Sequence, residues 1–144
     1  MKQLLFSFTC ALRGMRRALQ SERNLRIHLL AAGVVCALAG LSGVEPWAWA
    51  ALILCSALVV GAELFNTAIE VLADRVESKK NALIRDAKDV AAGAVLCCAI
   101  GAVVVACVVF LRAEVLATLS RRLPALAGLM VVAAVGLLLV LHDQ

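Results

Sequence analysis

The run VAAGAVLCCAIGAVVVACVVFL, residues 90–111, contains no charged residue and is long enough to cross a bilayer as one helix. Shorter apolar runs at 29–44 and 46–62 precede it, and another at 123–141 follows it. In lipid, every backbone polar group must find a partner within the protein, and no run alternates as the strands of a membrane barrel do. We therefore expect an all-α fold, an integral membrane helical bundle.

The composition supports this class and limits the size of the protein. Apolar residues make up 64% of the chain and the mean hydropathy is +0.99, far above the values of soluble domains. A chain of 144 residues has room for one small domain and not for a soluble catalytic domain beside its spans. Any chemistry must be carried by the helices themselves.

The basic residues predict the topology, because cytoplasmic segments of membrane proteins carry an excess of lysine and arginine. They gather before the first apolar run and between the second and third: Lys2, Arg13, Arg16, Arg17, Arg23 and Arg26, then Arg75, Lys79, Lys80, Arg85 and Lys88. The turn at 43–46 has none. We expect both basic regions to be cytoplasmic, with Trp47 and Trp49 either anchoring the opposite interface or packing against neighbours.

The segment after the third span fits this topology less well. Arg112, Arg121 and Arg122 would lie outside if every apolar run crossed the membrane. The run at 123–141 is therefore either a fourth span or a re-entrant or peripheral segment.

The N-terminal segment, 2–20, is predicted to be an amphipathic surface helix. Its arginines interrupt the apolar stretch too early for a secretory signal. Apolar residues recur at helical spacing, as in a helix that lies on a membrane: Leu4, Phe8, Ala11, Leu12, Met15 and Leu19. A simpler alternative is that its basic face only orients insertion and touches anionic lipid.

The cysteines and histidines do not suggest a metal site. The six cysteines lie in apolar stretches without CxxC spacing, so we interpret them as small hydrophobic residues: Cys10, Cys36, Cys55, Cys97, Cys98 and Cys107. His28 opens a span and His142 lies near the end of the sequence, so both are expected at interfaces and neither as a ligand.

The end of the second span carries the strongest functional pattern. Three carboxylates and an amide fall within an arc of roughly 80° on one helix face: Glu63, Asn66, Glu70 and Asp74. Ionisable residues at such depth are costly and usually mark a functional site. The alternative is a solvated helix end whose carboxylates pair with Arg75, Lys79 or Arg26, which explains Asp74 well and Glu63 poorly.

Two charged clusters, at 21–26 and 85–89, border the same surface. Ser21 or Asp86 could be helix N-caps, with Asp89 completing a capping box. Together with the stripe, acidic residues and a lysine where helices leave the bilayer suit a Mg²⁺ ion and a polyphosphate. The sequence contains neither a P-loop nor a GxGxxG motif, so an ATP site here would be of another design.

Three blocks of sequence closely resemble the prokaryotic diacylglycerol kinase family. They are ERNLRIHL at 22–29, ELFNTAIE at 63–70 followed by Asp74, and AKDVAAGAVL at 87–96. The likeness covers about residues 8–111 and is nearest to the branch that contains undecaprenol kinases.

The resemblance implies a homotrimer with a surface helix, three spans per chain near 27–44, 46–73 and 87–111, and active sites at the cytosolic interface between subunits. These spans would form a membrane lipid kinase domain over 1–111, with 112–144 as an extension that most members lack. It implies a bacterial inner-membrane enzyme that moves the γ-phosphate of MgATP directly to diacylglycerol or undecaprenol. A nucleic-acid partner is not expected.

The resemblance also assigns roles to single residues. Glu63 matches the catalytic base, and Glu22 and Glu70 match the carboxylates that hold Mg²⁺ and contact ATP through it. Lys88 and Asp89 match residues that bind ATP, and Asn66 and Asp74 match polar positions that line the site. The loop of Lys79, Lys80 and Asn81 occupies the place beside the nucleotide although its residues differ from the family's, and Arg26 is expected to line the site. A small transporter or channel subunit with ion-binding carboxylates is the main alternative, and a structural assembly protein is another.

Overall fold

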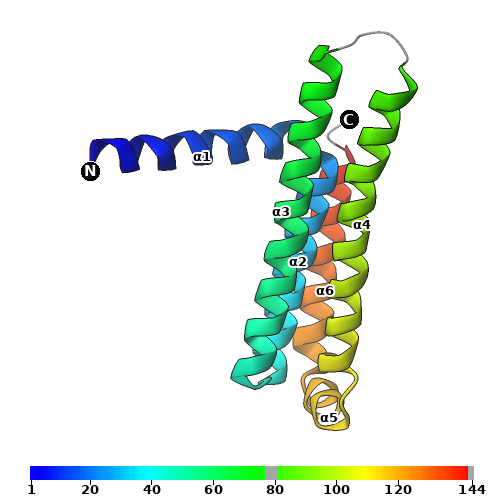
Figure 1. The fold of residues 1–144 in the computed structure, drawn as a ribbon. Coiled ribbons are helices and arrows are strands. Elements are labelled where there is room, and N and C mark those ends of the chain that lie inside the picture. The colour runs from blue at the N-terminus through cyan, green and yellow to red at the C-terminus, as the bar shows by residue number, and fades with distance from the viewer. Residues whose placement is uncertain (77–80, 143–144) are drawn as a thin grey trace.

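The computed structural model describes residues 1–76 and 81–142, and this part of the chain is all-helical (Figure 1). Its helices are α1 (Lys2–Ser21), α2 (Arg23–Ser42), α3 (Pro46–Val76), α4 (Ala82–Phe110), α5 (Ala113–Arg121) and α6 (Leu123–His142). By length and composition, α2, α3, α4 and residues 124–142 of α6 could each cross a membrane. The predicted helical membrane fold is confirmed.

Helix α3 packs against both α2 and α4, and α6 runs along α2 (Figure 1). Helices α3 and α4 have 31 and 29 residues. At 1.5 Å per residue each is about 45 Å long, well beyond the roughly 30 Å hydrocarbon core of a bilayer. Part of both helices must therefore stand outside the hydrocarbon.

The α2–α3 turn closes one end of the bundle. Gly43 ends α2 in the left-handed conformation (φ 65°), which glycine adopts without strain, and Pro46 begins α3. Small residues let the helices approach closely here, in a core of Ala39, Ala48, Leu52 and Val109. Trp49 packs against this core, whereas Trp47 is half exposed, donates its indole N–H to Glu45 and lies under the guanidinium of Arg112.

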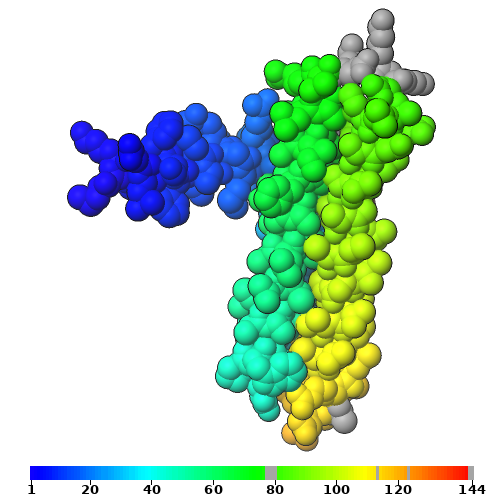
Figure 2. Space-filling view, in the orientation of Figure 1, coloured from blue at the N-terminus to red at the C-terminus, as the bar shows by residue number. Residues whose placement is uncertain are grey.

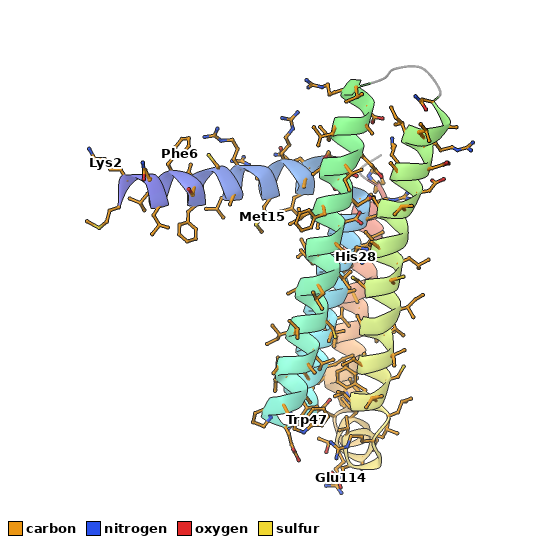
Figure 3. The ribbon with its side chains drawn as sticks, viewed as in Figure 1. Lys2, Phe6, Met15, His28, Trp47 and Glu114 are labelled. Atoms are coloured by element: carbon orange, nitrogen blue, oxygen red, sulfur yellow. The ribbon has the colours of Figure 1, made fainter. Side chains whose placement is uncertain are left out.

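The C-terminal segment contains a helix that we did not expect. The stretch 112–122, for which the sequence predicts no helix, holds the nine-residue helix α5 at the Trp47 end of the bundle (Figure 3). Helix α6 then returns along α2, where an added Cβ at Gly136 would lie 3.0 Å from Cδ1 of Leu30. This path has the geometry of a fourth span and places Arg112, Arg121 and Arg122 around the α5 end.

Helix α1 lies across the bundle axis and touches the bundle near its own C-terminus, where Ala18 is buried (Figure 2). Most of its apolar side chains are exposed, including Leu4, Phe8 and Leu12. Met15 projects from the side of α1 that faces along the bundle, and Lys2 from the opposite side (Figure 3). This is the arrangement of a helix lying on a membrane surface.

The predicted helix caps were wrong. Glu22, in an extended conformation, separates α1 from α2, and Ser21 ends α1 with its hydroxyl donating to the carbonyl of Arg17. Helix α4 begins at Ala82, earlier than expected, because the Asn81 side chain accepts a hydrogen bond from the Leu83 amide at 2.9 Å. Asp86 and Asp89 therefore lie inside α4 and cap nothing.

Candidate active site

The polar stripe on α3 runs from the packed interior of the bundle to its open end. Glu63 and Asn66 are only 2% and 7% exposed, Glu70 is half-buried and Asp74 is exposed. The Thr67 hydroxyl, also buried, donates to the Glu63 carbonyl within the helix. Burial therefore decreases along the stripe, from Glu63, which the protein encloses, to Asp74, which is in contact with solvent.

The Glu63 carboxylate, on α3, lies where α2 packs against that helix. Glu22, just before α2, and Glu70, two turns along α3, both lie within electrostatic reach of it. The side chain of Asn24 hydrogen bonds to it, and His28 is a further electrostatic neighbour. Two further negative charges therefore act on the Glu63 carboxylate, which is costly unless a cation or a proton compensates them.

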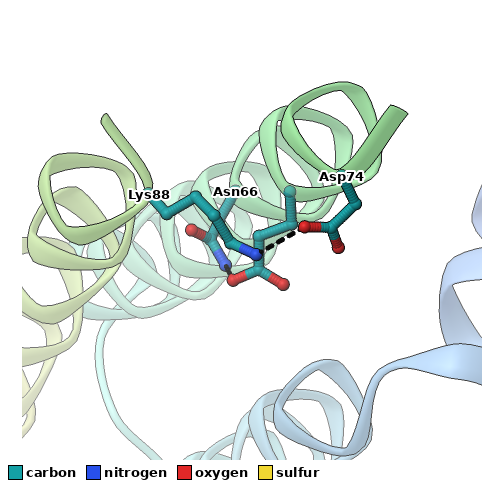
Figure 4. Close-up of polar contacts among 4 residues, drawn as sticks. Asn66, Asp74 and Lys88 are labelled. Carbon is teal, nitrogen blue, oxygen red and sulfur yellow. Dashed lines mark hydrogen bonds and ion pairs between the residues drawn. The ribbon is translucent and has the colours of Figure 1, made fainter. Parts of the chain in front are cut away.

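Asn66 links the buried and the half-buried parts of the stripe. Its amide Nδ2 donates to Oε1 of Glu70 at 3.0 Å (Figure 4). Its own carbonyl atom Oδ1 is buried and has no hydrogen-bond partner among the residues that the structure describes. A buried acceptor in this state is a group that a bound ligand could satisfy.

Helix α4 contributes a cation from the opposite wall. The Nζ atom of Lys88 lies 2.9 Å from Oδ1 of Asp74, and Glu70 is within its electrostatic reach (Figure 4). Asp74 therefore pairs with Lys88. Lys88 thus lies near the half-buried part of the stripe, which is Glu70.

Other predicted site residues lie less close. Asp89 is exposed on α4, and no hydrogen bond or ion pair joins it to the cluster within residues 1–76 and 81–142. Asn81 caps α4, and Arg26 is half-buried on α2. Lys79 and Lys80 fall outside the described residues.

Sequence reasoning missed two residues of the cluster. Asn24 was noted only as part of a charged segment, and His28 was assigned to an interface without a partner. The two are four residues apart and so share one face of α2, which was the available signal. That this face meets Glu63 follows from the packing of α2 on α3, which no local pattern contains.

The cluster can be tested as a magnesium site. No three side chains of His, Cys, Asp or Glu in the described chain are close enough to form a complete metal cage. Mg²⁺, however, usually takes one or two carboxylates and completes its shell with water and phosphate oxygens. Glu22 and Glu70, both within electrostatic reach of Glu63, suit such a partial site, and the unsatisfied acceptor of Asn66 lies next to Glu70 on α3.

The fold and this cluster define a multi-pass membrane protein with a carboxylate-rich site at one end of its bundle. A sequence profile described as prokaryotic diacylglycerol kinase matches residues 9–110. The chain belongs to that prokaryotic family, as the three sequence blocks predicted.

Two curated relatives give the scale of the similarity. The chain is 45% identical over 103 residues to the diacylglycerol kinase of Synechocystis sp. (strain ATCC 27184 / PCC 6803 / Kazusa), a match that covers 71% of this chain and only 59% of that protein. It is 34% identical over 105 residues to the undecaprenol kinase of Bacillus subtilis (strain 168), covering 73% of this chain and 85% of that protein. No solved structure matches significantly.

Proposed function

We propose that this protein is a membrane lipid kinase that transfers the γ-phosphate of ATP to the hydroxyl of diacylglycerol or undecaprenol. The observation that carries the proposal is the enclosed Glu63 carboxylate, with Glu22 and Glu70 beside it and Lys88 on the facing helix. Membership of the family, and the printed functions of the two relatives, support the same activity.

In this proposal Glu63 is the general base. It takes the proton of the lipid hydroxyl, whose oxygen forms a bond to the γ-phosphorus while the bond to the bridging oxygen of ADP breaks. Phosphoryl transfer needs mainly positioning and neutralisation of charge, so no covalent enzyme intermediate is required. The depth of Glu63 on α3 suits a substrate whose hydroxyl lies at the interface while its tail stays in lipid.

The other residues hold the nucleotide. Glu22 and Glu70 would hold Mg²⁺, which would supply positive charge to neutralise the phosphates. Lys88 would exchange Asp74 for phosphate oxygens. The remaining proposed contacts to ATP are Asp89, Asn81, Lys79 and Lys80, with Asn66, Asp74 and Arg26 lining the site.

The proposed setting follows from the charge distribution. The site end carries the basic residues of α1 and of the start of α2, together with Arg75, Arg85 and Lys88 of α3 and α4, so we assign it to the cytoplasmic side of a bacterial inner membrane. We further propose that residues 1–111 form the kinase domain, that 112–144 form an extension, and that three copies assemble with shared sites.

A transfer assay tests the activity directly. Purified protein in mixed micelles receives γ-labelled ATP, Mg²⁺ and either diacylglycerol or undecaprenol. We expect labelled lipid from at least one of them, and the Glu63→Gln variant should lower kcat by roughly 10²- to 10⁴-fold because it removes the base. Glu45→Gln, at the opposite end of the bundle, is the matched control and should retain activity.

Comparing the rates with diacylglycerol and with undecaprenol also identifies the substrate, because the lipid that is phosphorylated faster is the preferred one. Folded protein that labels neither lipid would refute both assignments. Equal rates in Glu63→Gln and the wild type would refute the role of Glu63 alone.

A further inference from the structure

The environment of Glu63 raises a question that the proposed base role leaves open. Its carboxylate is 2% exposed and has the carboxylates of Glu22 and Glu70 as neighbours. The charged form of a buried carboxylate is strongly disfavoured unless a hydrogen bond or a positive charge stabilises it, and nearby negative charges disfavour it further. A working base also has to be held in one orientation if it is to accept a proton from a hydroxyl. Some group in the protein therefore has to offset the charge of Glu63 and hold its carboxylate in one orientation before the reactants bind.

The first two turns of α2 supply such groups. The Asn24 amide hydrogen bonds to the Glu63 side chain, and His28 is an electrostatic neighbour of the same carboxylate. Residues four apart lie on the same face of a helix, so one face of α2 brings both side chains to one carboxylate. The extended conformation of Glu22 (φ −105°, ψ 113°) ends α1 and lets α2 start at Arg23, directly before this face.

A second observation places His28 on the α3 side of α2. Its side chain lines a groove of about 160 Å³ together with Val35 of α2, Ser56 and Val59 of α3, and alanines of α4. The ring is half-buried, near the site end of the bundle (Figure 3). His28 therefore faces the helix that carries Glu63, and its ring is not simply an interfacial group in contact with solvent.

We propose that Asn24 and His28 are positioning residues for Glu63, an inference that rests on the proposed kinase function. Asn24 fixes the orientation of the carboxylate by a hydrogen bond to it, and His28 stabilises its charge. The carboxylate keeps capacity to accept the proton of the lipid hydroxyl as the new oxygen–phosphorus bond forms and ADP leaves. Neither residue needs to touch lipid or nucleotide, so both act through Glu63.

Alanine variants test the proposal through kinetic constants. Asn24→Ala and His28→Ala should each lower kcat roughly ten- to hundredfold, the usual effect of losing a hydrogen bond to a charged group. KM for MgATP should stay near the wild-type value, because the nucleotide is held elsewhere. His28→Gln, which keeps an N–H donor but cannot carry a positive charge, should recover little of kcat. Gln20→Ala on exposed α1 and His142→Ala on α6 are matched controls and should behave as the wild type.

A double-mutant cycle separates positioning from a general structural effect. Glu63→Asp retains a carboxylate but withdraws it from its partners, so adding His28→Ala to Glu63→Asp should cost much less than it does in the wild type. Fully additive effects would overturn the proposal. If an alanine variant fails to fold, as judged by thermal unfolding, Asn24→Gln and His28→Gln are compared in the same cycle and decide the matter.

The outcomes also keep this inference apart from the proposed function. Wild-type protein that phosphorylates neither lipid overturns the kinase proposal and this one with it. Active wild-type protein whose Asn24→Ala and His28→Ala variants have unchanged kcat overturns only the positioning roles.

Discussion

The Nζ atom of Lys88 on α4 lies 2.9 Å from Oδ1 of Asp74 on α3, and this ion pair joins the two long helices across the open end of the site. The Asp74 side chain is 70% exposed, so the pair is well solvated. Exposed ion pairs add little to stability because water and salt screen them. The lysine is therefore held weakly, in a place where a polyphosphate can compete for it.

Replacing Lys88 by Met should weaken ATP binding without unfolding the protein. We expect KM for ATP to rise roughly ten- to hundredfold through loss of one charge-assisted contact, while the thermal unfolding midpoint changes little. Asp74→Asn breaks the same ion pair but keeps the cation, so it is the control. Equal rises of KM in both variants would mean that the ion pair itself, and not the lysine charge, matters for ATP.

Replacing Glu70 by Gln should change the response to magnesium. The substitution keeps a hydrogen-bonding group for Asn66 but removes one of the two carboxylates proposed to hold the ion. The Mg²⁺ concentration that gives half-maximal activity should rise roughly ten- to hundredfold, the range seen when the surroundings of a metal are disturbed. Glu114→Gln, at the far end of the bundle, provides the comparison (Figure 3). An unaltered magnesium titration in Glu70→Gln would remove Glu70 from the metal site.

The two phenylalanines Phe6 and Phe8 test how α1 lies on the membrane. Both are exposed in the isolated chain, but they are two residues apart and so point to nearly opposite sides of the helix. In a protein with Trp47 and Trp49 changed to Phe, we expect Phe8→Trp to give blue-shifted emission that brominated lipids quench. Phe6→Trp should emit as in water. Similar quenching at both positions would contradict a surface helix.

Crowding the contact between α6 and α2 should lower stability and leave the chemistry intact. A side chain at Gly136 meets Leu30, whereas an added Cβ at Gly128, on the same helix, has nothing within 4 Å. Gly136→Leu should lower the free energy of unfolding by about 1 to 3 kcal/mol, as overpacking usually does, and Gly128→Leu by much less. KM for ATP should not change in either. A loss of activity without loss of stability in Gly136→Leu would show that α6 influences the site.

Much of the fold follows from simple patterns. Long uncharged runs can only be spanning helices, and a helical period places Glu63, Asn66, Glu70 and Asp74 on one face. These properties depend on one segment at a time, so sequence alone was sufficient. Helix α5 was missed because a short helix between charged residues has no apolar run to reveal it.

The parts of the cluster that join different helices were not predictable from local patterns. Asn24 and His28 reach Glu63 only because α2 packs on α3, and Lys88 reaches Asp74 only because α4 returns beside it. The start of α4 was misplaced for a related reason. The charges at 85–89 resembled a helix start, yet the Asn81 cap begins the helix earlier, above the apolar run.

The length of α3 has a consequence for how the proposed kinase would meet its reactants. Glu63 and Asp74 are about 16 Å apart along the helix axis at 1.5 Å per residue, so in that proposal Glu63 would lie near the lipid hydroxyls and Asp74 in the water phase. One reactant then arrives by diffusion in two dimensions and the other by diffusion in three. The phosphorylated lipid can leave sideways at the depth where it formed, while ADP returns to bulk water, so neither product has to change phase.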